Sequence, residues 1–225
     1  MHEASVVIAR PQPCEQLVLI FHGVGSSAQD LAPLGKTLAQ ACPGAAVVSV
    51  QAPYPSQLGR GQEWFSVVGV TEDNRPGRIA QAMPQFVQTI RHWQDVMGID
   101  AANTVLVGFS QGGIMSLAAS LQEPGLCGRV LGFGSRFVDL PLQAPETVTY
   151  HLFHGKSDNV IHYGFAVSAA ERLVAIDAEG NLTDAQWATL NEANAIVFGS
   201  PTYMGTVSWQ FKKFADASSK QWFSQ

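Results

Sequence analysis

A serine stands between two glycines in the stretch Gly108-Phe109-Ser110-Gln111-Gly112, directly after a run of apolar residues. The pattern G-x-S-x-G is typical of a nucleophile elbow, a sharp turn between a strand and a helix that exposes the serine hydroxyl. A strand is predicted before Ser110 and a helix after it, as the motif requires. A Gly/Ser turn without chemistry is the alternative, but this context favours Ser110 as the nucleophile of an acyl transfer.

A second glycine-rich turn, His22-Gly23-Val24-Gly25, also follows an apolar strand. In ester hydrolases a loop of this type gives one backbone N–H to the oxyanion hole, and the residue after the nucleophile gives another. Here the donors would be Val24 and Gln111, and each is worth roughly 2.7–4 kcal/mol of barrier. His22 could accept a proton, but its place at a strand end beside a glycine favours a hydrogen bond that shapes the loop.

Asp158 is the candidate acid, in the loop after a predicted strand over 147–155. Its place after the nucleophile agrees with the chain order Ser, Asp, His in hydrolases with such an elbow. A carboxylate there would orient a base histidine and stabilise its cation. The alternative is an Asp turn residue before Asn159, and the position favours the catalytic role.

Strands and helices alternate along most of the chain, which predicts a mostly parallel sheet with helices on both faces. The predicted strands are 5–9, 17–22, 45–53, 104–109, 129–135 and 147–155. The predicted helices are 28–42, 78–98, 112–124 and 163–175, and a long loop occupies 54–75. Beyond residue 176 the sequence predicts a helix with Thr183 as its N-cap, a strand over 195–199 and a final helix over 206–219.

Composition and charge exclude several classes of protein. The 225 residues are 46% hydrophobic and 14% charged, with a net charge of −5 and no Lys/Arg run, so no nucleic-acid partner is predicted. The widely spaced Cys14, Cys42 and Cys127 favour reduced thiols in a cytoplasmic protein over a disulfide framework or a zinc site. Neither a signal peptide nor an apolar window of about 18 residues is found, so no membrane span is predicted.

Four stretches, in this order and spacing, resemble the bacterial carboxylesterases of the phospholipase/carboxylesterase (acyl-protein-thioesterase-like) family: FHGVG, EWFSVVGVTEDNR, VLVGFSQGGIMS and HLFHGKSDNVI. The resemblance covers residues 5–175. It implies an α/β-hydrolase fold and the hydrolysis of a small-molecule ester or thioester.

The resemblance also assigns roles to residues. It implies Ser110 as nucleophile and Asp158 as triad acid. It implies Val24 and Gln111 as the oxyanion donors. Trp64 and Phe65, in the long loop, would line an acyl pocket, or they would pack that loop onto the sheet.

The histidine of such a triad is missing. The family has it in a Gly-His pair about 30 residues after the acid, where this chain reads WATLNEANAIVFGSPTY. The last histidine is His162, and the others are His2, His22, His92, His151 and His154. A serine without a base is barely ionised at neutral pH, and binding and oxyanion contacts alone leave about 10³–10⁴-fold catalysis over water. Impaired or absent turnover is predicted, with His162 as the first candidate for a substitute base.

The tail, residues 183–225, resembles an internal fragment of the flavodoxin-like NAD(P)H:quinone oxidoreductases. Its FGSPTYMG is similar to the loop that lies against the flavin ring in that family. The chain lacks that family's first strand and its phosphate loop, whose backbone amides would hold the anion. FMN binding is therefore not expected, and neither a cofactor nor a metal is predicted. The simpler role for Pro201 to Gly205 is a strand-to-helix turn.

The two resemblances divide the chain into a C-terminally incomplete α/β-hydrolase core, residues 1–176, and a flavodoxin-like fragment, residues 177–225. One right-handed crossover would place 195–199 beside the strand over 147–155, so that the fragment replaces the last strand and helix of the hydrolase. The alternatives to an impaired esterase are a non-catalytic acyl-binding remnant and a flavoprotein fragment. No oligomeric state is predicted.

Overall fold

The computed structural model describes residues 4–141, 145, 147–173, 202–203 and 206–207. The chain divides into two compact units, Met1–Ala166 and Val167–Gln225. The predicted boundary between 176 and 177 lies outside the described residues and stays a prediction.

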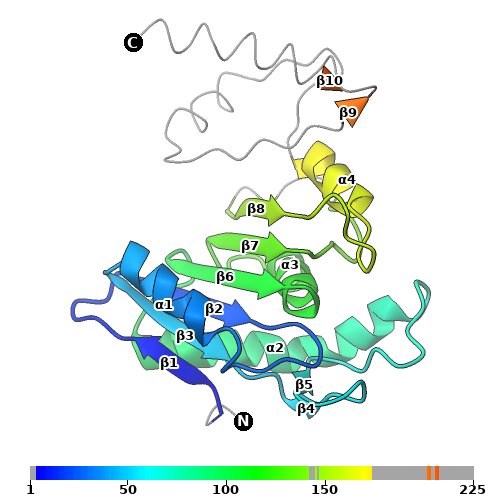
Figure 1. The fold of residues 1–225 in the computed structure, drawn as a ribbon. Helices are drawn as coiled ribbons and strands as arrows, with labels where there is room; N and C mark the ends of the chain where they lie inside the picture. Colours follow the sequence, from blue (N-terminus) through cyan, green and yellow to red (C-terminus); the bar gives the residue numbers. More distant parts are fainter. Residues whose placement is uncertain (1–3, 142–144, 146, 174–201, 204–205, 208–225) are drawn as a thin grey trace, which may run out of the picture. The chain divides into compact units, whose positions relative to one another are not determined.

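Six described strands form the central sheet of the first unit (Figure 1). They are β1 (Val6–Ala9), β2 (Gln16–Phe21), β3 (Ala45–Val50), β6 (Thr104–Phe109), β7 (Arg129–Phe133) and β8 (Thr149–Phe153). Their order is β1-β3-β2-β6-β7-β8; β1 is antiparallel to β3 and the other pairs are parallel. Every residue of β3 is buried, as expected for an apolar strand covered on both faces.

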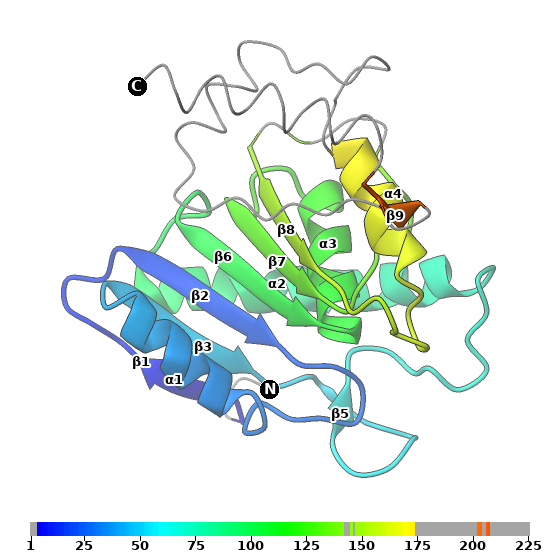
Figure 2. The same cartoon turned by 45° about the horizontal axis from the view of Figure 1, so that its top comes forward.

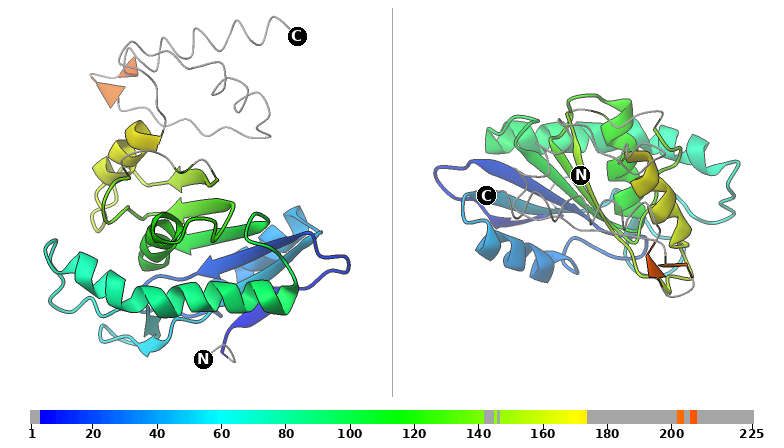
Figure 3. Two further views of the ribbon diagram at one scale, coloured as in Figure 1. Left: turned by 180° about the vertical axis from the view of Figure 1, so that it is seen from behind. Right: turned by 90° about the horizontal axis from the view of Figure 1, so that it is seen from above.

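Helices cover both faces of this sheet, as predicted (Figures 2 and 3). α1 (Ala32–Ala41) lies on one face, and α2 (Arg75–Met97) and α3 (Gln111–Gln122) lie on the other. α2 continues through Pro84 and ends at Gly98, whose φ of 68° suits a glycine at a helix C-terminus. α4 (Gly164–Leu173) begins where a helix was predicted.

Several element boundaries differ from the predicted ones by two or more residues, and two differences concern loops near the site. α1 begins at Ala32 rather than 28, because Ser26 Oγ donates to Asp30 Oδ2 (2.9 Å) and holds the preceding residues in a turn. The loop predicted over 54–75 contains the hairpin of β4 (Tyr54–Pro55) and β5 (Gln62–Glu63).

The second unit contains the described antiparallel pair β9 (Thr202–Tyr203) and β10 (Thr206–Val207). The predicted helix start at Thr206 is therefore wrong, and Thr202 and Tyr203, predicted to lie in a strand-to-helix turn, form a strand, while 201 and 204–205 lie outside the described residues. Threonine, tyrosine and valine favour strands, and here that preference prevails. The elements predicted from Thr183 and over 195–199 lie outside the described residues.

No helix in the described part of the chain is long and apolar enough to cross a membrane. Cys14, Cys42 and Cys127 are free thiols. Burial raises the pKa of the Cys127 thiol to about 12, so this cysteine is unreactive at neutral pH.

Candidate functional site

The predicted nucleophile occupies a strained turn between β6 and α3. Ser110 has φ 51° and ψ −117°, and it is the one non-glycine residue with positive φ among the described residues. Such a conformation costs on the order of 1–3 kcal/mol and is concentrated at functional sites. Two backbone hydrogen bonds hold it: Ser110 N–H donates to Phe133 O (2.9 Å), and Ser110 O accepts from Ile114 N–H (3.0 Å). The strand–turn–helix context of the elbow is confirmed.

Glycine is required on both sides of Ser110 for steric reasons. A Cβ on Gly112 would collide with the Phe21 carbonyl and would lie 2.7 Å from His22 O. A Cβ on Gly108 would collide with the backbone of Gly113. The start of α3 can therefore approach the end of β2 because Gly112 carries no side chain, and the end of β6 because Gly108 carries none.

The loop after β2 lies against the nucleophile. A Cβ on Gly23 would lie 3.2 Å from Ser110 Cβ, so the backbone that leads to Val24 adjoins the elbow. Figure 1 shows the arrowheads of β2, β6, β7 and β8 at the same edge of the sheet. The loops with Val24, Ser110 and Asp158 follow three of these strands, β2, β6 and β8, at that edge, where open α/β sheets bind their ligands.

His22 shapes this loop, as predicted, and does not act as a base. Its Nδ1–H donates to Gly23 O (2.8 Å), and its Nε2 accepts from Ala52 N–H (3.1 Å). The side chain is buried, and this desolvation lowers the pKa of His22. A neutral imidazole with both nitrogens in use has no lone pair for a serine proton.

Trp64 packs the long loop onto the sheet. Its indole is 3% exposed and lies edge-on against Phe86, with ring centroids 5.0 Å apart. Its Nε1–H donates to His22 O (3.0 Å). These contacts match the packing alternative for Trp64.

Gln111 has a side-chain role that sequence reasoning missed. Its Oε1 accepts from Trp64 N–H (2.8 Å), and its Nε2–H donates to Phe65 O (2.7 Å). The residue after the nucleophile therefore fixes the loop of Trp64 and Phe65 from inside the protein. The partners are 46 and 47 positions away, so no local pattern could have indicated the contact.

Asp158 lies at the same sheet edge as Ser110. A Cβ on Gly134 would be 3.5 Å from Asp158 Oδ2 and 3.8 Å from the ring of Phe109, the residue before the nucleophile. Asp158 Oδ1 accepts from the N–H groups of Ile161 and Val160, both at 2.9 Å. These hydrogen bonds, Ile161 first, lower the pKa of Asp158, so it is a carboxylate at neutral pH. The same two hydrogen bonds are typical of an Asp that stabilises a turn, so the turn role weighed for Asp158 is compatible with this geometry as well.

Among the described residues no histidine is hydrogen-bonded to Ser110. His154 Nε2 lies 2.7 Å from Ile161 O and 3.4 Å from Asp158 Oδ2, which ties it to the acid loop. His162 Nδ1 accepts from Gly164 N–H (3.1 Å) at the start of α4, so the predicted substitute base is engaged there. His151 lies on β8, and burial lowers its pKa.

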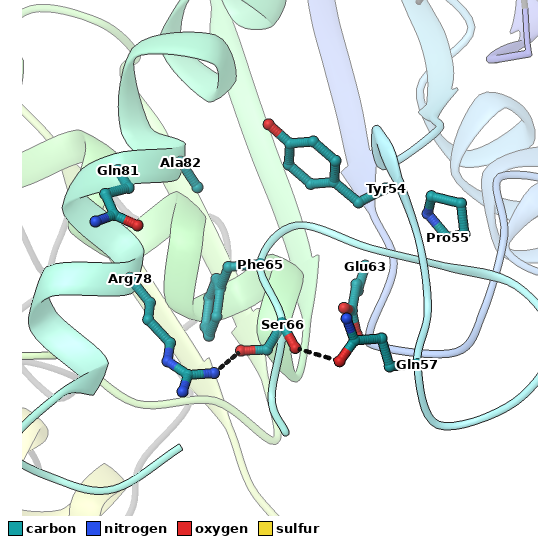
Figure 4. A pocket seen from close by; sticks show the side chains of 9 residues that line it. All are labelled: Tyr54, Pro55, Gln57, Glu63, Phe65, Ser66, Arg78, Gln81 and Ala82. Carbon is teal, nitrogen blue, oxygen red and sulfur yellow. Dashed lines mark hydrogen bonds between the residues drawn. The ribbon is translucent and has the colours of Figure 1, made fainter. Parts of the chain in front are cut away.

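A cavity of about 560 Å³ lies beside the loop that Gln111 holds (Figure 4). Tyr54 and Glu63 of the β4–β5 hairpin, Phe65 of the following loop and Arg78 of α2 contribute to its wall. Phe65 lines this cavity, but Trp64, Ser110 and Asp158 do not, so the acyl-pocket role of Trp64 and Phe65 stays a prediction. No cluster of His, Cys, Asp and Glu that could hold a metal is present in the described ranges.

Comparisons with known proteins agree with this geometry. The phospholipase/carboxylesterase family model matches residues 2–189. The chain is 44% identical over 182 residues to the esterase YpfH of Escherichia coli (strain K12), covering 81% of this chain and 78% of that protein. It is also 50% identical over 76 residues to the flavodoxin FldP of Pseudomonas aeruginosa (strain UCBPP-PA14), covering 34% of this chain and 41% of FldP.

Solved structures with a similar fold include an esterase and a carboxylesterase. Esterase PE8 is 28% identical with a TM-score of 0.65, covering 72% of this chain and 78% of that one. The carboxylesterase of Bacillus cereus, at 15% identity, shares the fold with a TM-score of 0.60, covering 74% and 76%. With this fold and the elbow at Ser110, the chain belongs to the phospholipase/carboxylesterase family and is a carboxylesterase-type serine hydrolase.

Proposed function

We propose that this chain keeps the nucleophile, the acid and the oxyanion donors of an esterase but hydrolyses its small-molecule ester or thioester slowly. One observation carries the proposal: a serine held in a nucleophile elbow, in a chain with no histidine after His162. A positioned general base contributes about 10²–10⁴-fold in rate, and this contribution is the one expected to be lost.

In the proposed reaction Ser110 Oγ attacks the substrate carbonyl carbon, and its proton passes to solvent. The oxyanion is stabilised by the backbone N–H groups of Val24 and Gln111 and by the N-terminus of α3. Collapse of the intermediate expels the alcohol or thiol, and water then releases the acid from the acyl-enzyme. No imidazole bridges Asp158 and Ser110 in this scheme, and His154 Nε2, 3.4 Å from Asp158 Oδ2, is hydrogen-bonded to Ile161 O, so the carboxylate gives only a weak electrostatic contribution.

Hydrolysis of p-nitrophenyl acetate at pH 7.5 and labelling by a fluorophosphonate probe test this proposal on the full chain, with Ser110→Ala as control. Weak hydrolysis and slow labelling, both absent from the variant, are expected. Rates of an intact triad that disappear in Ser110→Ala would show that another group serves as base. No labelling at all would favour the acyl-binding remnant, and bound flavin absorbance would favour the flavoprotein fragment.

The proposed domain organisation keeps the hydrolase core at 1–176 and the flavodoxin-like fragment at 177–225. Because matches of 182 and 76 residues together exceed the 225 residues of the chain, the esterase and flavodoxin matches overlap. Some residues thus resemble both families, and the flavodoxin match, at 76 residues, extends beyond the 49 residues of 177–225. A protease-resistant core that reaches past residue 200 is expected, and rapid tryptic trimming to about residue 172 would contradict a shared sheet.

We place the protein in the cytoplasm. The free Cys14, Cys42 and Cys127 support this location, because thiols stay reduced there. Fractionation of the producing cells tests it, and recovery of the protein from a secreted fraction would contradict it.

A further inference from the structure

The 560 Å³ cavity has a chemically distinctive wall on its hairpin side. Tyr54 of β4 and Glu63 of β5 are directly opposite each other in the antiparallel pair, so their side chains lie on the same face of the hairpin. Phe65 adds a second aromatic ring to the lining. Figure 4 shows Glu63 and Gln57 on one side of the cavity and Arg78 on the other, with Ser66 between them.

Glu63 is a buried carboxylate without a cationic partner among the described residues. Its side chain is 2% exposed, and its one hydrogen bond is a long one from Ser56 Oγ (3.3 Å). No lysine, arginine or histidine nitrogen of the described chain lies within 4.0 Å of it. Glutamates are almost never fully buried unless paired, so this carboxylate still has capacity for a cationic hydrogen-bond donor.

Arg78 does not neutralise Glu63 across the cavity. Its guanidinium donates to the carbonyls of Ser66 (2.7 Å), Val68 (2.8 Å) and Gly69 (3.2 Å). It is therefore committed to fixing the loop before α2. The negative side of the cavity stays separate from this positive charge.

We propose that the cavity binds a small organic ammonium ion, with the ammonium N–H groups at Glu63 and its apolar part between Tyr54 and Phe65. The carboxylate supplies charge-assisted hydrogen bonds, and the aromatic rings favour a cation over a neutral group. The volume lies within the range of small-molecule sites, about 300–1,000 Å³. This site requires no turnover at Ser110 and adds a ligand to the esterase function proposed above.

Binding of benzylammonium chloride to the full chain tests the proposal, with benzyl alcohol as the neutral probe of the same shape. Titrations by calorimetry or ligand-observed NMR should give a dissociation constant in the millimolar range for the cation. Binding of the alcohol should be at least about tenfold weaker, because it lacks the charge that a buried carboxylate selects. Equal affinity for the two probes, or no binding of the cation, would overturn the proposal without reference to esterase activity.

Two variants locate the site. Glu63→Gln keeps the side-chain shape and should reduce the preference for the cation to about twofold or less. Asp73→Asn makes the same change of charge at an exposed residue outside the cavity and should leave the binding unchanged. If Glu63→Gln does not fold, Tyr54→Leu provides a second test, because Tyr54 is half-exposed. This variant should still lower the affinity for benzylammonium several-fold, since it removes an aromatic ring from the wall of the cavity. Wild-type affinity in Glu63→Gln or in Tyr54→Leu would refute the assignment.

Discussion

The side chain of Gln111 holds the backbone of Trp64 through a buried hydrogen bond of 2.8 Å between Trp64 N and Gln111 Oε1. The same carboxamide binds the carbonyl of Phe65. Gln111 follows the nucleophile, and its own N–H is a proposed oxyanion donor. One residue thus joins the elbow at Ser110 to the loop that separates it from the cavity of Glu63.

Gln111→Ala should destabilise the protein strongly while keeping the backbone N–H at that position. Both hydrogen bonds are lost, and the buried Trp64 N–H and Phe65 carbonyl are left without partners. Each such loss costs about 1–3 kcal/mol, so the free energy of unfolding should fall by roughly 2–6 kcal/mol. Urea denaturation followed by tryptophan fluorescence measures this change.

Gln88→Ala is the matched control for that variant. Gln88 is exposed on α2, so its truncation should change the free energy of unfolding by less than about 0.5 kcal/mol. Equal stability of the two variants would mean that the carboxamide of Gln111 does not hold the loop.

Gly112→Ala should disturb the elbow by a direct collision. The added Cβ meets the Phe21 carbonyl and lies 2.7 Å from His22 O, so β2 and α3 must separate. Overpacking of this kind costs about 1–3 kcal/mol, and fluorophosphonate labelling at Ser110 should be lost with it. Thermal unfolding and labelling are the measurements.

Gly77→Ala provides the opposite expectation in the same protein. A Cβ there meets nothing within 4 Å, and the residue lies in α2. Alanine should therefore raise the stability by up to about 1 kcal/mol through its better helix propensity. If Gly112→Ala were as stable as Gly77→Ala, the steric account of the elbow would be wrong.

The elbow and the central sheet could be predicted because their physical causes are local in sequence. The glycines at Gly108 and Gly112 directly flank the strained Ser110, and the apolar strands β2 and β3 are continuous buried runs. A rule that spans a few residues can identify such features.

The hairpin and the site contacts could not be predicted for the converse reason. β4 and β5 have two residues each, and Gln62 and Glu63 have no strand preference of their own. Their pairing depends on contacts with the rest of the fold, such as the bridge of Gln62 to Ser26. The buried charge of Glu63 likewise follows from its position in three dimensions.

His22 should make the protein less stable in mild acid. Burial lowers the pKa of His22 below the ordinary 6.5. Just below pH 6.5 the histidine is therefore protonated in the unfolded chain but still neutral in the native protein. The contribution of neutral His22 to the free energy of unfolding is fully present above about pH 6.5. It is lost as the pH falls through the lowered pKa, by at most about 1.4 kcal/mol per pH unit. Urea denaturation between pH 7.5 and 5 measures the slope.

His22→Gln should flatten that slope. His151 also has a lowered pKa and acts in the same direction, so part of the dependence should persist in the variant. An identical pH dependence in wild type and His22→Gln would exclude His22 as a source of acid sensitivity.

Free imidazole should accelerate ester hydrolysis by this chain if, as proposed, Asp158 is the acid and Ser110 the nucleophile of a triad that lacks its base. Gly134 presents no side chain toward Asp158 Oδ2 and the Phe109 ring, so the imidazole would approach this oxygen on the side of Gly134, away from His154, whose Nε2 lies 3.4 Å from it. Asp158 would accept the imidazole N–H, and the other ring nitrogen would take the proton of Ser110. At 0.1 M imidazole, hydrolysis of p-nitrophenyl acetate should rise on the order of tenfold, a fraction of the 10²–10⁴ of a positioned base.

The increment has to be separated from hydrolysis by imidazole in solution, and Ser110→Ala with the same imidazole concentration gives that background. Asp158→Asn is the informative variant, because its amide oxygen can still accept from the N–H groups of Val160 and Ile161 and keep the loop. It should retain the unassisted rate but lose most of the acceleration, since it no longer stabilises an imidazolium. Acceleration of the same size in Asp158→Asn would exclude Asp158 from the site, and acceleration in Ser110→Ala as large as in the wild type would exclude Ser110 as the nucleophile.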